Sequence, residues 1–214
     1  MARAFAEITF TPSVRETQAA QGSAGSYLKF LEPEAERGDR LGEREASFVA
    51  ARDGFYQATV SETGWPYVQF RGGPVGFVRV LDDRTLAYAD FRGNRQYLSI
   101  GNLKSDDRVS LILMDYVNRR RLKVWGRARV VDAADDPKLI EDLRIDGYRA
   151  LSERAVIVTV EAYDWNCPQH IPQRLTLQEL EPHLSPLRDE IDRLTAENTA
   201  LRSSLAAAQP ERNT

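Results

Sequence analysis

The spacing of hydrophobic and polar residues divides the chain into three parts. From residue 55 to about residue 162 the period is near two, and short runs of β-branched and aromatic residues alternate with Gly, Pro and Asp turn signals. This pattern is typical of antiparallel strands joined by hairpins. About seven strands are expected, at residues 55–61, 67–70, 77–81, 85–89, 109–116, 121–131 and 155–162.

Two helical patterns interrupt the strands. One covers residues 94–104 and carries apolar side chains on one face, and the other covers residues 136–143 and is opened by an Asp-Pro pair. Many short antiparallel strands with helices inserted at the corners favour a closed or nearly closed barrel, because closure removes exposed strand edges. We therefore predict an α+β, mainly β, fold.

The segment before the strands reads as helices and loops. Thr11 and Pro12 supply an N-cap and a first helical residue for a helix over residues 12–21, and a second helix is expected over residues 43–51. Residues 22–26 are a linker by composition. We divide the chain into an N-terminal segment (1–43) that packs on the barrel, a barrel domain (44–182) and a final helix (183–214).

The final helix has a heptad pattern. Apolar residues and one Asn recur at alternating spacings of three and four, which is the a/d pattern of a coiled coil. The positions are Leu184, Leu187, Ile191, Leu194, Asn198, Leu201 and Leu205. Asn198 falls at an a position, and Glu197 and Arg202 fall at g and e. Two interpretations remain: a parallel dimeric coiled coil, or an amphipathic helix lying on its own barrel.

Charge and composition exclude several classes of function. With Lys+Arg 29 and Asp+Glu 32 the net charge is −3, so there is no global basic field for a nucleic-acid backbone. The single cysteine, Cys167, excludes an internal disulfide and a zinc site built from several thiolates. No apolar run reaches the roughly 18 residues of a membrane span. We expect a cytoplasmic protein without a nucleic-acid or membrane partner.

The first candidate binding segment lies at the end of the second expected strand. Gln69 and Arg71 precede Gly72 and Gly73. Two glycines let the backbone approach a ligand, and their N–H groups beside an arginine form a possible phosphate cradle. The alternative interpretation is an ordinary Gly-Gly-Pro loop.

The second segment lies where a strand passes into the helix expected to begin at Asn94. A helix N-terminus with arginines attracts anions, because its free N–H groups and the helix dipole act together. The candidate residues here are Asp90, Arg92, Asn94, Arg95 and Gln96. Together with the first segment they predict one shared phosphate site, and the alternative is a solvated charged loop.

Two further segments carry candidates. In the basic run 119–121, Arg121 lies within a strand and is the member expected to face a ligand. After the last strand, Trp165 offers a stacking surface, with Asn166 and Gln169 beside it as polar lining. Cys167 and His170 are candidate catalytic residues. Metal sites need three or four ligands, so no metal site is predicted.

The order of these segments resembles the pyridoxamine 5′-phosphate oxidase-like flavin-nucleotide-binding proteins, over roughly residues 44–174. The resemblance implies a split β-barrel that forms a homodimer and binds FMN at the subunit interface. It implies that Arg71, Asn94 and Arg95 bind the flavin phosphate. It also implies that Arg121 contacts the cofactor and that Trp165 closes the pocket, with Arg174 near it.

The sequence departs from the oxidase pattern at the substrate motif. The Arg-Pro and Ser motif expected after the helix near Asp142 is absent, and residues 147–152 read Gly-Tyr-Arg-Ala-Leu-Ser instead. We therefore expect an FMN-dependent oxidoreductase that acts on another small molecule. The alternatives are a deazaflavin (F420) protein, and a non-catalytic cofactor binder whose coiled-coil tail mediates association.

Overall fold

The computed structural model describes residues 1–165 and 168–208. It consists of two compact units, Met1–Ile171 and Pro172–Thr214, which are described separately. The first unit contains the sheet and all but one of the helices in the described residues, and the second contains the long helix.

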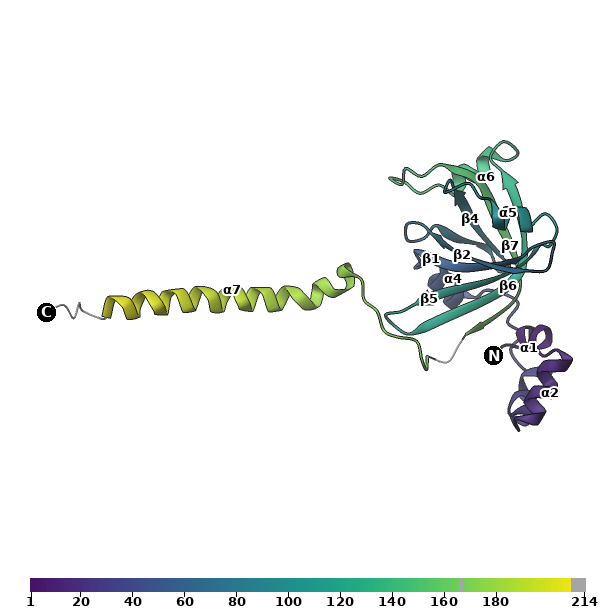
Figure 1. Cartoon of the computed structure of the whole chain (residues 1–214), viewed down its shortest axis with the longest axis horizontal. Coiled ribbons are helices and arrows are strands. Elements are labelled where there is room, and N and C mark those ends of the chain that lie inside the picture. Colours follow the sequence, from purple (N-terminus) through teal and green to yellow (C-terminus); the bar gives the residue numbers. More distant parts are fainter. Residues whose placement is uncertain (166–167, 209–214) are drawn as a thin grey trace. The chain divides into compact units, whose positions relative to one another are not determined.

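The first unit is built on one antiparallel sheet (Figure 1). Its seven strands are β1 (Gly54–Val60), β2 (Pro66–Gly72), β3 (Val78–Asp82), β4 (Thr85–Phe91), β5 (Arg108–Asp115), β6 (Arg120–Asp132) and β7 (Ser152–Trp165). They lie in the order β2-β1-β5-β6-β7-β4-β3. The α+β, mainly antiparallel fold and the three predicted hairpins are confirmed.

The sheet curls without closing. Strand β7 is 14 residues long and pairs with β6 on one side and β4 on the other, so it joins the two halves. Strands β2 and β3 are the two edges of the sheet. The barrel is therefore split, and the inner faces of β2 and β4 meet across the opening without strand pairing.

Aromatic and aliphatic side chains fill the interior. The ring of Phe55 lies 5.8 Å from that of Phe77 and 5.1 Å from that of Tyr88. The core continues along β5, β6 and β7, where inward residues such as Leu122 are fully buried. Gly126 lies at a register shift between β6 and β7, and a Cβ there would come within 2.3 Å of the Thr159 carbonyl oxygen. That close backbone approach requires glycine.

The helices before the sheet cover part of the barrel. They are α1 (Arg3–Thr9), α2 (Pro12–Ala20), α3 (Ala24–Leu28), a short 3₁₀ helix (Lys29–Leu31) and α4 (Glu43–Ala50). Helix α1 packs on the outside of the sheet, with Phe5 5.3 Å from Trp125. The prediction of a linker over residues 22–26 is wrong, because α3 begins within it.

The helix after β4 differs from the sequence prediction. Helix α5 (Leu98–Asn102) is only five residues long, and residues 94–97 are not helical. The side chain of Asn94 accepts a hydrogen bond from the Gln96 N–H at 3.1 Å, which gives the backbone a local alternative to the helix. Arg95 and Tyr97 adopt positive φ angles of 62° and 55°. The predicted helix N-terminus at Asn94 is therefore wrong. The helix expected over 136–143 is present as α6 (Pro137–Asp142).

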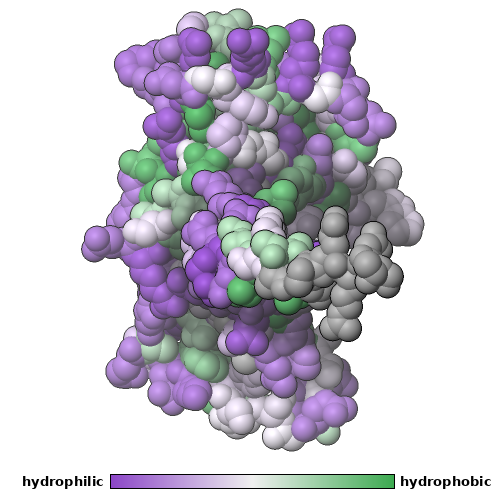
Figure 2. Space-filling view, turned by 90° about the vertical axis from the view of Figure 1, so that its left-hand side faces the viewer, coloured by the Kyte–Doolittle hydropathy of each residue, from purple (hydrophilic) through white to green (hydrophobic). Residues whose placement is uncertain are grey.

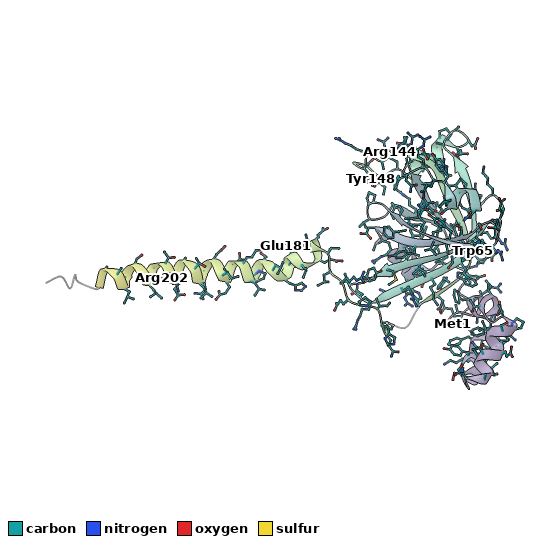
Figure 3. All side chains as sticks on the ribbon, in the orientation of Figure 1. Met1, Trp65, Arg144, Tyr148, Glu181 and Arg202 are labelled. Carbon is teal, nitrogen blue, oxygen red and sulfur yellow. The ribbon has the colours of Figure 1, made fainter. Side chains whose placement is uncertain are left out.

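The second unit contains α7 (Leu177–Ala208), a helix of 32 residues that begins before the predicted heptads. Figure 3 shows side chains projecting along its length, with Glu181 and Arg202 toward its two ends. The face of the molecule in Figure 2 is mainly hydrophilic, with smaller hydrophobic patches. No helix among residues 1–165 and 168–208 is long and apolar enough to span a membrane.

Candidate functional site

The opening between β2 and β4 is bridged by a buried ion pair. Along β2, Tyr67, Gln69 and Arg71 alternate with exposed residues, so their side chains point inward. Arg71 Nη1 donates a hydrogen bond to Asp90 Oδ1 at the end of β4. Only 14% of the Arg71 side chain and 6% of the Asp90 side chain are exposed. Strands β2 and β4 have no backbone hydrogen bonds to each other, and this ion pair is a side-chain connection between them.

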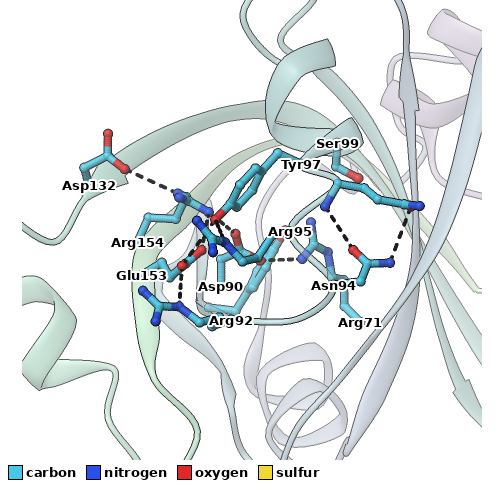
Figure 4. Close-up of polar contacts among 12 residues, drawn as sticks. Arg71, Asp90, Arg92, Asn94, Arg95, Tyr97, Ser99, Asp132, Glu153 and Arg154 are labelled. Carbon is cyan, nitrogen blue, oxygen red and sulfur yellow. Dashed lines mark hydrogen bonds and ion pairs between the residues drawn. The ribbon is translucent and has the colours of Figure 1, made fainter.

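The pair continues into a charged network on β7 (Figure 4). Arg154 Nη1 donates to Asp90 Oδ2 at 2.9 Å and also lies 3.2 Å from Glu153. Glu153 accepts a hydrogen bond from Arg92 Nε at 2.7 Å, and this bond lowers the pKa of the Glu153 carboxyl. The register of β4 against β7 brings these groups together, since Asp90 pairs with Arg154.

Two buried N–H groups beside the network have no hydrogen-bond partner in the described part of the chain. They are Arg71 Nε and Gln57 Nε2. Gln57 accepts a hydrogen bond from the buried Tyr88 hydroxyl through its Oε1, and burial raises the pKa of Tyr88. An unpaired buried donor is costly, so each of these N–H groups is a position at which a water or a ligand oxygen would be a favourable acceptor.

The loop between β4 and α5 forms the other wall. Arg95 Nε donates to the Tyr97 hydroxyl at 3.4 Å, and that hydroxyl donates to Glu153 at 3.3 Å. Ser99 donates to Gln69 Oε1 at 3.0 Å, which ties the start of α5 to β2. Arg95 forms no ion pair with any residue that the structure describes. Its charge is therefore available to a ligand.

These elements enclose a polar pocket of about 170 Å³. An adjoining hollow of about 150 Å³ shares Gln69, Arg71, Asp90 and Phe91 with it. The pocket is lined by aromatic and aliphatic side chains as well as by the charged groups. Its apolar lining comes from Tyr67, Phe91, Tyr97, Leu98 and Ile100.

The structure brings six of the predicted cofactor-binding residues to this pocket. They are Gln69, Arg71, Asp90, Asn94, Arg95 and Gln96. Arg92 lies in the same loop but outside the lining, paired with Glu153. Gly72 lines the adjoining hollow.

Gly73, the second glycine after Arg71, is explained by its packing and its backbone hydrogen bond. The Gly73 N–H donates to the Asp53 carbonyl at 2.9 Å, so it is not free to bind a phosphate. A Cβ on Gly73 would lie 2.7 Å from the Phe77 ring. The predicted cradle of glycine N–H groups is therefore wrong at Gly73, where close packing explains the residue.

Arg121 and Trp165 do not line this pocket. Arg121 precedes the fully buried Leu122 on β6, so its side chain points to the outer face of the sheet. Trp165 Nε1 donates to Glu45 on α4 at 2.7 Å, and its ring contacts Phe48. Within one chain, these two predicted contacts are absent from the pocket lining.

The segment after β7 contributes no described residue to the pocket. Asn166 and Cys167 lie outside the described residues. Gln169 and His170 are exposed, and His170 has a positive φ of 71°. Arg174 belongs to the second unit. Among the described residues there is no group of three or more His, Cys, Asp or Glu that could hold a metal ion.

Sequence reasoning missed several residues of the site. Tyr67, Tyr97 and Ser99 line the pocket, and Glu153 and Arg154 supply its charges from β7. The inward alternation of β2 could have indicated Tyr67, since it lies two and four residues before Gln69 and Arg71. The β7 residues depend on strand register, for which the local sequence carries no signal.

Comparisons with known proteins identify the family. The family model described as Pyridoxamine 5′-phosphate oxidase matches residues 41–163, more than half of the chain. No curated protein matches. The similar solved structures include a putative pyridoxamine 5′-phosphate oxidase from Lactobacillus delbrueckii, with 21% identity and a TM-score of 0.46 over 59% of this chain and 94% of that one. HupZ from Group A Streptococcus has 15% identity and a TM-score of 0.47 over 63% of this chain and 100% of that one. An FMN-binding protein from Syntrophomonas wolfei has 14% identity and a TM-score of 0.47 over 70% of this chain and 97% of that one. By the family match, the chain belongs to the pyridoxamine 5′-phosphate oxidase family.

Proposed function

We propose that the pocket between β2, β4 and the β4–α5 loop binds the phosphate-bearing end of FMN, and that the protein is an FMN-dependent oxidoreductase acting on a small molecule. The observation that carries this proposal is Arg71. Its Nε is buried without a hydrogen-bond partner among the described residues, at a pocket that also holds the unpaired charge of Arg95. A phosphate oxygen would supply the acceptor that Arg71 Nε lacks.

The donor set fits a flavin nucleotide. Arginines suit phosphate because the guanidinium presents several N–H groups in a fixed plane. The Gln69, Asn94 and Gln96 amides and the Ser99 hydroxyl could bind the hydroxyls of a ribityl chain, and aromatic lining suits an apolar ring. When bound, FMN supplies hydride chemistry. The residues of this chain hold the phosphate and orient the ring.

The proposal includes a homodimer with the cofactor at the subunit interface. The pocket of about 170 Å³ is by itself smaller than the roughly 300–1,000 Å³ of typical ligand sites, so FMN would extend beyond it, into the adjoining hollow of about 150 Å³ and against a second copy of the chain. The outer face of β1 and β2 is apolar where a solvated sheet is usually polar: Tyr56, Val68 and Phe70 are 39%, 60% and 57% exposed. Arg121 also lies on an outer sheet face, so its proposed contact with a cofactor depends on the dimer.

A single cysteine favours a reducing compartment, and we propose a cytoplasmic location.

The binding test is a titration of FMN into the purified protein, after an absorption spectrum and mass analysis of any cofactor released on denaturation. We expect Arg95→Ala to weaken FMN binding by about tenfold, since one charged hydrogen bond contributes roughly 1.5 kcal/mol or more. Arg92→Ala is the matched control, because Arg92 lies in the same loop but outside the pocket lining. Equal affinities of the two variants, or a protein that binds no FMN, would refute the site.

Two alternatives differ in cofactor or in catalysis. A deazaflavin such as F420 also presents a phosphate, and the absorption spectrum distinguishes it from FMN. A non-catalytic binder would hold the flavin without turnover. Reduction of the bound flavin by a nicotinamide nucleotide, followed by reoxidation with an added acceptor, separates the enzyme from the passive binder.

A further inference from the structure

Helix α7 exposes a long apolar stripe. Six of its large aliphatic residues are between 48% and 84% exposed, while Leu180 and Leu184 are half-buried. The six are Leu177, Leu187, Ile191, Leu194, Leu201 and Leu205. The helix begins at Leu177, seven residues before Leu184, so Leu177 and Leu180 continue the a/d pattern toward the N-terminus. The stripe therefore runs the full length of α7. An exposed apolar surface of this extent and regularity indicates a contact with another protein surface.

The two prolines of α7 do not interrupt this stripe. With Leu177 at an a position, Pro182 and Pro186 fall at f and c, on the side of the helix away from a and d. Proline removes one backbone hydrogen bond and bends a helix, but here the lost bonds face outward. Residues 187–208 are free of proline and span about 33 Å at 1.5 Å per residue, which is three heptads.

We propose that α7 pairs with α7 of a second copy of this chain as a parallel, in-register, two-stranded coiled coil. Asn198 occupies an a position between Ile191 and Leu205. In a parallel coil the two copies of an a residue meet in one layer, so the Asn198 side chains hydrogen-bond to each other. In an antiparallel coil Asn198 would lie against Leu187 of the other helix, and its amide would be left unpaired.

Charges beside the stripe favour the same orientation. In a parallel coil, Glu197 at g faces Arg202 at e of the second copy, and the contact occurs twice by symmetry. In an antiparallel coil Glu190 would face Glu197 of the other helix, with like charges opposed. Within the helix, Arg193 lies 2.8 Å from Glu190 and 3.1 Å from Glu197, which tethers both carboxylates on the g side of the stripe. Such rim charges act mainly on orientation.

The proposal rests on α7 alone and does not depend on what the pocket binds. A failed flavin titration leaves it intact, and failure of the coil leaves the flavin site intact. The test must therefore report on α7 itself, because the proposed barrel dimer would also make the full chain dimeric.

The first experiment is disulfide formation in the purified full-length chain carrying Cys167→Ser. Leu201→Cys at a d position brings two thiols into one layer of a parallel coil, within the Cα separation of less than about 7 Å that a disulfide needs. We expect most of this variant to become a covalent dimer on mild oxidation. Ala196→Cys, at the outward f position, is the matched control and should stay uncrosslinked. Equal crosslinking of the two variants would overturn the proposal.

A second experiment measures orientation without a substitution in the stripe. A spin label on Ser203→Cys, again with Cys167→Ser, sits at an f position. In the parallel coil the two labels lie at the same height, separated only by the width of the helix pair. In an antiparallel coil whose two helices overlap along their full length, residue 203 faces residue 182, so the labels would be displaced along the axis by about 32 Å. The longer distance, or no measurable pair, would refute a parallel self-association and point to an antiparallel coil or a different partner.

Discussion

The ion pair across the split barrel leads to a prediction about Asp90→Asn. This substitution should lower the stability of the folded chain and increase the stabilisation that added phosphate gives. The Asp90 carboxylate lies between Arg71 and Arg154. The exposed fraction of the side chain is 6% for Asp90, 14% for Arg71 and 13% for Arg154. Replacing Asp90 by Asn keeps the volume and one acceptor oxygen but removes the charge. Two mostly buried guanidiniums then face each other without their shared carboxylate.

The expected cost follows from this burial. Removing one partner of a buried ion pair typically costs about 3–5 kcal/mol, and we expect about 3 kcal/mol for Asp90→Asn because the amide oxygen still accepts a hydrogen bond. For a unit the size of Met1–Ile171, each kcal/mol lowers Tm by roughly 2–4 °C, so a loss of about 6–12 °C is expected.

Phosphate should partly restore the variant. The freed Arg71 guanidinium can bind an anion in place of the carboxylate, and phosphate at ten times its Kd would stabilise the folded state by about 1.4 kcal/mol, or roughly 3–6 °C. The assay is thermal unfolding with and without inorganic phosphate, at constant ionic strength. The unsubstituted protein should gain less, because Asp90 already neutralises Arg71.

Asp132→Asn is the matched control. Asp132 also contacts Arg154, at 3.3 Å, but its side chain is 64% exposed. Exposed ion pairs contribute about 1 kcal/mol or less, so its Tm should change by a few degrees at most and should respond to phosphate no more than that of the unsubstituted protein. If Asp90→Asn melted like this control, or if phosphate raised the Tm of both equally, the reasoning about the pair would be refuted.

Two further predictions concern the barrel. Gly126→Ala should lower the urea midpoint by the equivalent of about 1–3 kcal/mol, because its Cβ would meet the Thr159 carbonyl at 2.3 Å; an unchanged midpoint would contradict the close approach. Burial alone would raise the pKa of Asp115, but hydrogen bonds from Asn118 and the charge of Arg52 outweigh it and lower that pKa. The ionised Asp115 therefore adds stability above the unfolded pKa of about 3.9, and this stability is lost as pH falls through the lower folded pKa. Asp115→Asn should accordingly be less stable than the parent at pH 7, and the two should converge below about pH 4; a gap that does not change with pH would contradict this.

The strands and hairpins could be predicted because their signals are local. A period of two between turn residues is set by the pleat itself, and each hairpin pairs neighbours in sequence. The helix expected over residues 94–104 shows where local reasoning failed. Its apolar spacing was helical, but the Asn94 side chain hydrogen-bonds to the Gln96 backbone, and Tyr97 takes a positive φ. A polar side chain near a strand end can outweigh four residues of helical pattern.

The charges of the site could not be predicted for a different reason. Arg71 was a candidate because it precedes two glycines, and Asp90 because it precedes an expected helix N-terminus, yet their direct pairing across the opening was not foreseen. Glu153 and Arg154 join them only through the register of β7 against β4. Contacts between residues sixty positions apart depend on how the sheet curls, and a single sequence without an alignment carries little information on that.

Arg71 links the stability of the barrel to the proposed binding of an anion. Strands β2 and β4 are not hydrogen-bonded to each other, so the pair between Arg71 and Asp90 is a direct polar connection across the opening. Arg71 has one N–H group committed to Asp90 and another buried without a partner in the described residues. A phosphate that used the second group would not need to break the first. Ligand binding would then add to the connection between the two halves of the barrel, and protection of β2 and β4 from hydrogen exchange should rise together when FMN binds. Protection confined to one of the two strands would contradict a shared anchor at Arg71.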